Sequence, residues 1–189
     1  MNPFIADRHF KNEDYTSNRL ERGDYEECTF EGCHFQNSFL DNQNFVDCIF
    51  VDCDLSNANV SHTIFNGVSF KNCKLVGLQF EKVNTGLLSF KFLNCNLTLA
   101  SFNALKIQRT HFTGSNLSQA DFSEANLTEG DFSDCNLQKT VFERSILNKA
   151  NLTTAFNFTI DPERNQLKNA RFSKEGLLGL LKKYDIVVE

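Results

Sequence analysis

The residues with the clearest capacity for chemistry are seven cysteines, four of which form two pairs with C-x4-C spacing. Cys28 and Cys33 form the first pair, and Cys48 and Cys53 form the second. Thiolates are zinc ligands, so this spacing admits a metal site if the sulfurs converge. Each of the seven cysteines, however, stands two positions before a large apolar residue, where a free thiol packs as a small hydrophobe. Because the odd count also argues against a disulfide framework, the sequence favours buried, reduced cysteines over a metal or redox site.

No constellation of residues typical of an enzyme is found. The four histidines are His9, His34, His62 and His111. His34, His62 and His111 are expected to point to solvent, and His9 is expected at the N-terminal cap. The sequence has no Walker-type glycine loop, nucleophile elbow or H-x-x-x-H motif, and Ser133-Asp134 is ordinary repeat composition. The sequence therefore predicts a protein that is not an enzyme and needs no cofactor.

The elements that carry these residues repeat every five positions. An apolar or aromatic residue recurs at every fifth position from Phe10 to Phe80 and, after a two-residue slip, from Leu87 to Leu152. The residue two positions earlier is usually small. A period of five fits neither an amphipathic helix nor an alternating strand, but it fits a polygonal coil in which the same residue recurs once per side.

Stretches such as Ala120-Asp121-Phe122, followed by two polar residues, show the repeat most clearly. This pattern resembles the pentapeptide-repeat family. The resemblance implies an all-β fold, a right-handed quadrilateral β-helix in which each pentapeptide forms one side and about twenty residues form one coil. The apolar residue and the small residue would point inward, and the other three would face solvent.

Twenty-residue spacing then predicts vertical ladders of like residues. The expected aromatic ladders are Phe10, Phe30, Phe50 and Phe70 on one side, Tyr25, Phe45 and Phe65 on another, and every tenth residue from Phe92 to Phe142 on two opposite sides. Cys33, Cys53 and Cys73 should stack as thiols. Phe90 and Leu105 are large residues at small positions and are expected to bulge the coil locally.

One domain, residues 1–189, is predicted. Its expected parts are an N-terminal cap (1–9), repeats (10–80), the frame slip (81–86), repeats (87–156) and a C-terminal cap and dimerisation segment (157–189). Asn84, Thr85 and Gly86 suit a bulge or short turn. The slip is either a tolerated insertion or a recognition bulge that re-aims nearby side chains.

The C-terminal segment has its own pattern. Ser173 is a candidate N-cap for a helix over 174–184, and a short strand is expected at 186–188. A solenoid end needs a cap to cover its open core and unpaired edges. This segment is more apolar than one coil end requires, so it is either a simple cap or a homodimer interface. The candidate interface residues are Leu177, Leu178, Leu180, Leu181, Ile186, Val187 and Val188.

Charge is unevenly distributed along the chain. Residues 1–54 hold twelve acids and four bases, a net charge of −8, whereas residues 55–120 hold one acid and six bases, a net charge of +5. The acids are either a solvated face or a surface that imitates the phosphates of DNA. The candidate acidic surface comprises Glu27, Asp47, Asp52, Asp54, Asp121, Glu124, Glu129, Asp131 and Asp134.

The segment Asp161-Pro162-Glu163-Arg164-Asn165 and the leucine-rich stretch after it resemble the C-termini of the microcin-immunity and Qnr quinolone-resistance branches of the family. This resemblance implies a homodimeric DNA mimic that binds DNA gyrase or a related type II topoisomerase and modulates it or protects it from a toxin or drug. No direct nucleic-acid binding is expected. The sequence shows neither a transmembrane segment nor a leader, which predicts a cytoplasmic location. A scaffold solenoid with an unrelated protein partner is the alternative, favoured by the short loop and the basic middle segment.

Overall fold

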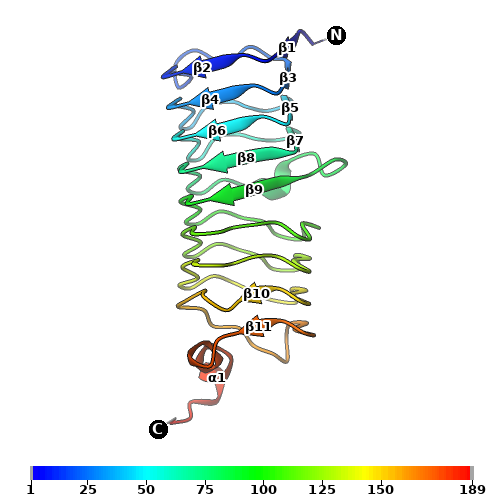
Figure 1. The fold of residues 1–189 in the computed structure, drawn as a ribbon. Helices are drawn as coiled ribbons and strands as arrows, with labels where there is room; N and C mark the ends of the chain where they lie inside the picture. The colour runs from blue at the N-terminus through cyan, green and yellow to red at the C-terminus, as the bar shows by residue number, and fades with distance from the viewer. Residues whose placement is uncertain (1, 188–189) are drawn as a thin grey trace.

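Parallel strands contributed by successive coils form two sheets in the N-terminal half of the molecule. The computed structural model describes residues 2–187, and it is a right-handed, four-sided solenoid whose coils stack along one axis (Figure 1). We name the four sides A to D in chain order. Side A carries a four-stranded sheet, β1-β3-β5-β7, and side B carries a five-stranded sheet, β2-β4-β6-β8-β9.

The strands are short because each spans one side of a coil. They are β1 (Phe4–Ala6), β2 (His9–Lys11), β3 (Asp24–Glu26), β4 (Thr29–Glu31), β5 (Asn44–Val46), β6 (Ile49–Val51), β7 (Ile64–Asn66), β8 (Val68–Lys71), β9 (Phe90–Leu93), β10 (Asn151–Leu152) and β11 (Arg171–Phe172). Strands β10 and β11 pair with each other lower on side B. Elsewhere, single bridges join the coils, such as Asp54↔Lys74 on side C and Phe39↔Asn59 on side D.

Stacked aromatic rings fill the core, as the twenty-residue spacing predicted. On side B, Phe10 and Phe30 stack with ring centroids 4.7 Å apart, and so do Phe30 and Phe50. In the lower half, Phe102 and Phe122 stack at 4.8 Å on side D. Rings that meet across the core adopt edge-to-face geometry, which is favourable for aromatic pairs. The core is therefore continuous from one end of the rod to the other.

Three expectations about the repeat boundaries are corrected by the structure. Within the stretch 1–9, expected as a cap, β1 pairs in parallel with β3 and forms a side of the first coil. Leu87, expected to point inward, is 64% exposed, because Phe90 fills the core at this level with its ring 5.3 Å from that of Phe80. Ile186 and Val187 form no strand, because no neighbouring coil offers them a backbone partner; Val188 lies outside the described residues.

A helical segment covers the C-terminal end of the solenoid (Figure 1). It comprises η2 (Glu175–Leu177), α1 (Leu178–Leu181) and η3 (Lys182–Tyr184), and the hydroxyl of Ser173 accepts a hydrogen bond from Gly176 N–H at 2.9 Å, as an N-cap does. Gly179 is required for close packing, because a Cβ there would overlap the ring of Phe158. No helix in residues 2–187 is long and apolar enough to cross a membrane.

Candidate partner-binding surface

Three acidic residues stack at the corner between sides A and B. Asp7, Glu27 and Asp47 occupy equivalent positions in successive coils, and all three have positive φ, between 50° and 53°. Their N–H groups donate to the coil below, with Glu27 N bonding Val46 O at 3.0 Å. The backbone therefore fixes the three side chains in one outward column, spaced at roughly 4.8 Å.

The acidic column ends at Gly67, the next residue at this corner. Gly67 also has positive φ, 68°, and a Cβ on it would overlap the Asp47 carboxylate oxygen. Glycine tolerates this conformation and leaves room for the carboxylate. The Asp47 side chain thus lies over a bare backbone at the lower end of the column.

Asp52 lies at the other end of β6 from Asp47, so carboxylates flank both ends of this strand. Asp52 is exposed and also has positive φ. Among residues 2–187, neither Glu27 nor Asp47 nor Asp52 has a cationic partner within 4 Å or a side-chain hydrogen bond. Asp54, on side C, differs, because Lys74 lies 3.8 Å away and the Asp54 carboxylate accepts Ser56 N–H.

The acids expected as a second group, lower in the solenoid, are mostly engaged with neighbours. Glu124 pairs with Arg144, and Glu129 pairs with both Arg109 (2.9 Å) and Lys149 (3.0 Å). Lys149 and Arg109 hold the pKa of Glu129 below its ordinary value. Once their three cationic partners are counted, these two carboxylates present no net negative charge to solvent.

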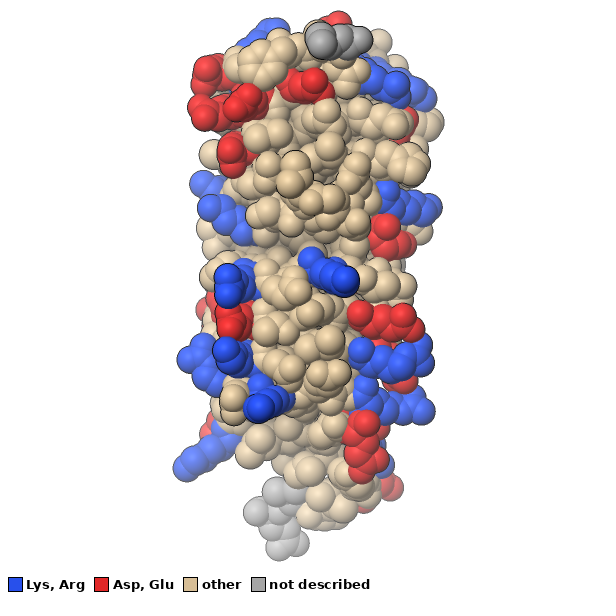
Figure 2. All heavy atoms as spheres, turned by 90° about the vertical axis from the view of Figure 1, so that its right-hand side faces the viewer, with Lys and Arg blue, Asp and Glu red and all other residues tan. Residues whose placement is uncertain are grey.

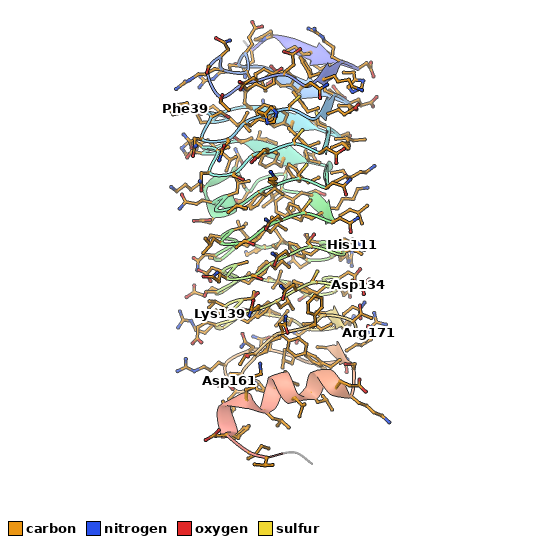
Figure 3. The ribbon with its side chains drawn as sticks, turned by 90° about the vertical axis from the view of Figure 1, so that its left-hand side faces the viewer. Phe39, His111, Asp134, Lys139, Asp161 and Arg171 are labelled. Carbon is orange, nitrogen blue, oxygen red and sulfur yellow. The ribbon has the colours of Figure 1, made fainter. Side chains whose placement is uncertain are left out.

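Asp121 and Asp131 are also tied to the protein. Asp121 accepts the N–H and hydroxyl of Ser123, and Asp131 accepts the amide of Asn151 at 2.8 Å. Burial opposes ionisation of Asp131, but hydrogen bonds from Ser133 and Asn151 leave its pKa below the usual value. Asp134 is exposed at the same edge as His111 (Figure 3). The structure thus separates the nine candidate acids: Glu27, Asp47 and Asp52 are free among the described residues, whereas Asp54 and all of the lower acids except Asp134 are engaged with neighbours.

The expected recognition bulge forms a loop that projects from side A between η1 (Phe80–Lys82) and β9 (Figure 1). Asn84 closes it, because its side-chain oxygen accepts Gly86 N–H at 2.9 Å and its own N–H bonds Thr63 O. Thr85 and Gly86 lie at the turn, followed by exposed Leu87. The loop is short and held at both ends by backbone hydrogen bonds.

The expected dimerisation segment exposes a large apolar area. Leu177 is 47% exposed, Leu178 49%, Ile186 56% and Val187 86%. Leu180 instead packs against the core, and Leu181 is half-buried. An open pocket of about 490 Å³ lies beside the contact between this helical segment and the last coil, and Phe156, Phe158 and Leu178 contribute to its lining.

Two ion pairs lock the cap to the solenoid. The ammonium of Lys183 lies 2.6 Å from both Asp161 and Glu163, and Tyr184 donates its hydroxyl to Glu163. The hydrogen bond from Lys183 keeps the pKa of Asp161 low. The cap is thus anchored through polar contacts while its outer face stays apolar.

The thiols and histidines do not converge. Cys33 and Cys53 stack on side C, where Cys33 N–H donates to Cys53 Sγ at 3.4 Å, and Cys73 and Cys95 continue this column. Cys28 and Cys48 stack separately at the start of side B. All seven cysteines are free and buried. Burial raises the pKa of Cys48 and of Cys135 to about 12.

Residues 2–187 contain no cluster of three potential metal ligands, and all four histidines are exposed.

One member of the acidic column, Asp7, was missed by the sequence analysis because 1–9 was assigned to a cap. The signal was present: Asp7 stands twenty residues before Glu27, as Glu27 stands twenty before Asp47. Figure 2 shows the resulting asymmetry, with acidic side chains gathered near the N-terminal end and mixed charges below.

A family model for the pentapeptide repeat region matches residues 23–91 and 86–172, which together span most of the chain. The chain belongs to the pentapeptide-repeat family. No curated protein matches the sequence significantly.

Among solved structures, QnrB1, described as a plasmid-mediated fluoroquinolone resistance protein, is similar in fold. A trypsin-treated form matches with a TM-score of 0.71 at 20% identity, covering 98% of this chain and 91% of that one. The full-length form matches with a TM-score of 0.60 at 18% identity, covering 97% and 100%.

Proposed function

We propose that this pentapeptide-repeat protein binds a type II topoisomerase, DNA gyrase or a relative, by presenting carboxylates where DNA would present phosphates. The observation that carries the proposal is the free acidic column of Asp7, Glu27 and Asp47, with Asp52 at the far end of β6. Among residues 2–187, these side chains have no cationic partner within 4 Å and no side-chain hydrogen bond, so they are available to a basic groove. The fold similarity to a quinolone-resistance protein supports the choice of partner.

The rigid spacing of the carboxylates favours mimicry over a nonspecific acidic tail. Backbone pairing between coils holds them at strand spacing, roughly 4.8 Å. Surface charges of this kind steer association and register more than they add affinity. Binding is therefore expected to weaken strongly with salt, because exposed charges are screened within about 8 Å at physiological ionic strength.

The active form we propose is a homodimer joined by the C-terminal segment. Leu177, Leu178 and Ile186 supply an apolar surface that the coil end does not use. Nine rows of side B, at strand spacing, give each solenoid a length of roughly 40 Å. Two copies joined end to end would span roughly 80 Å, or about twenty-four base pairs at 3.4 Å each. Deleting residues 173–189 should give a monomer in sedimentation; a full-length protein that is monomeric at micromolar concentration contradicts the dimer.

We assign the loop at Asn84, Thr85 and Gly86 a secondary role in this complex. Leu87 at its edge is 64% exposed and offers one apolar contact beside the charged surface. The whole complex would operate in the cytoplasm, where the partner enzyme acts, and the solenoid itself would neither bind nucleic acid directly nor catalyse a reaction.

The test is a supercoiling assay with purified gyrase. The full-length protein, at up to tens of micromolar, should inhibit supercoiling or protect gyrase from a quinolone or peptide poison, and raised salt should abolish the effect. Absence of both effects would replace this proposal with the scaffold alternative. One observation favours that alternative: the lower acids Glu124 and Glu129 pair with Arg109, Arg144 and Lys149, so much of the lower negative charge is neutralised within the protein.

A further inference from the structure

Backbone hydrogen bonds are missing directly beneath the loop on side A. At most repeat positions, the residue just before the inward apolar residue donates its N–H to the coil above, as Asn126 does at 2.8 Å and Asp131 at 3.0 Å; Phe39 and Gln79 do not. The equivalent N–H groups of Lys106 and His111 donate to no residue in the described part of the chain. Both residues are exposed, and backbone donors are nearly always paired with protein or with water, so these two N–H groups are open to water or to a bound ligand.

Phe90 lies at the gap. It occupies a position that is usually small, and it is only 5% exposed. Phe92 N–H bonds His111 O at 2.8 Å, but His111 N–H makes no return bond within the described part of the chain. The missing bond is consistent with the local bulge expected at Phe90. At Leu105 the contact with the coil below is regular, because Leu105 O accepts Asn126 N–H at 2.8 Å.

A cavity of about 200 Å³ lies in this gap, between the loop and the coil of Ile107. We call it the loop hollow; its polar lining is Ser89, Lys106, Gln108, Arg109 and Thr110. A water molecule takes about 30 Å³ of liquid volume, so the hollow has room for several waters or for one small polyatomic ion.

Thr110 supplies an independent observation. Thr110 is 6% exposed as a residue, and its hydroxyl makes no hydrogen bond with any residue from 2 to 187. Ser38 and Glu81, not Thr110, hold the fully buried oxygens without a partner in the described residues, so the Thr110 hydroxyl opens into the hollow. The corresponding hydroxyls of Thr63 and Thr140 donate to backbone carbonyls at 2.6 and 2.7 Å. A hydroxyl that is not used within the protein is free to donate to a ligand in the hollow.

The charge around the hollow is positive. Lys106 is exposed and has no carboxylate within 4 Å among the described residues. Arg109 lies at the rim, where its Nε donates a hydrogen bond to the Glu129 carboxylate at 2.9 Å. Glu81, on side D, is the single acid between residues 55 and 120. Figure 2, which looks onto the face with the loop, shows isolated basic side chains in its middle third.

We propose that the loop hollow binds a phosphate-sized oxyanion. The free N–H of Lys106 and the hydroxyl of Thr110 donate to its oxygens, the Lys106 ammonium balances its charge, and His111 N–H lies next along the chain. Backbone N–H groups left free by irregular chain geometry, with a cation beside them, are a general anion-binding arrangement. This site is independent of the acidic column and of the proposed topoisomerase partner.

The probe is inorganic phosphate, titrated into ¹⁵N-labelled full-length protein at constant ionic strength. The amide signals of Lys106 and His111 should shift saturably, with half-saturation below about 10 mM. Chloride should leave them unmoved. Overturning results are a linear response to phosphate, or acetate shifting the same amides as strongly, which would assign the hollow to a carboxylate.

Variants separate binding from folding. Thr110→Val removes an unpartnered hydroxyl, so the melting temperature without phosphate should not fall, while phosphate affinity should drop about tenfold. Lys106→Gln should weaken binding similarly, and the matched control Lys82→Gln, another basic residue in the same third of the chain, should leave it unchanged. Equal losses in Lys82→Gln, or unchanged affinity in Thr110→Val, would refute the site.

Discussion

The upper and lower halves of this solenoid share one period and one core but differ in backbone and in charge. Above the loop, sides A and B form true sheets, and apolar or β-branched residues such as Ile49, Val51 and Ile64 flank the inward rings. Below it, Asn or Asp more often precedes the inward residue, and apart from the pair β10–β11 single bridges join the coils. Asn126, for example, accepts the N–H and hydroxyl of Thr128. Side-chain bonds of this kind favour turns over strands, so local chemistry selects between two forms of the same coil.

The charge difference follows the same boundary. In the lower half, the twenty-residue spacing places Arg109, Glu129 and Lys149 in one column, and Glu124 above Arg144, so opposite charges meet. In the upper half, the same spacing also brings Lys11 to Glu31 and Lys74 to Asp54. At the corner between sides A and B, however, it places Asp7, Glu27 and Asp47 together, so like charges meet there. A column of like charges costs stability, which points to function as the reason for keeping it.

The largest effect should come from the shared core. Phe50→Ala removes a fully buried ring stacked on Phe30 at 4.7 Å and should reduce the free energy of unfolding by about 3–5 kcal/mol in urea titrations. Phe122→Ala, in the lower half, should cost a similar amount. A loss below about 1 kcal/mol in either variant would mean that one half does not depend on its aromatic ladder.

A smaller effect should distinguish the strand form of the coil above the loop from the turn form below it. Asn126→Ala deletes both bonds to Thr128 and should cost about 1–2 kcal/mol, whereas Thr29→Ala, at the same repeat position within β4, should cost under about 1 kcal/mol. Equal costs measured by denaturant unfolding would show that the side-chain turn bonds do not stabilise the lower form.

The thiol column should contribute little beyond filling space. Cys53→Ala should cost about 1 kcal/mol, since it removes one buried sulfur that donates to Phe30 O at 3.3 Å. The folded protein should also resist thiol reagents, because burial keeps the pKa of Cys48 at about 12. Stoichiometric zinc by elemental analysis, with loss of the fold on chelation, would contradict a purely structural role.

The smallest effect concerns the paired acids. The folded pKa of Glu129 is depressed, so its pair with Lys149 stabilises the fold above the unfolded value, about 4.3, and this contribution is lost as pH falls through the folded pKa. An NMR titration should find the pKa of Glu129 below its ordinary value, and Lys149→Ala should raise it. An unchanged pKa in Lys149→Ala would mean that the pair is not formed in solution.

The fold and the aromatic ladders could be predicted from sequence because one inward position recurs at fixed spacing. The sequence could not show which residue fills the core beside the loop. Leu87 and Phe90 compete for one inward position, and only packing decides between them. The ion pairs of Glu129 could have been predicted, since Arg109 and Lys149 stand twenty residues before and after it. The unpaired N–H of Lys106 could not, because it depends on the irregular backbone at the loop. The absence of a strand at Ile186 and Val187 reflects missing neighbours, which β-propensity alone does not reveal.

The central claim is that the upper acids are free to engage a partner and the lower acids are not. The decisive measurement is inhibition of gyrase supercoiling by two neutralised variants. One carries Asp7→Asn, Glu27→Gln, Asp47→Asn and Asp52→Asn, and the other carries Glu124→Gln, Glu129→Gln, Asp131→Asn and Asp134→Asn. Asparagine tolerates positive φ, and matching circular dichroism spectra would confirm that both variants fold. The account predicts that the first set weakens inhibition about tenfold and the second changes it less than about threefold. Equal losses in both variants, or a greater loss in the second, would contradict it.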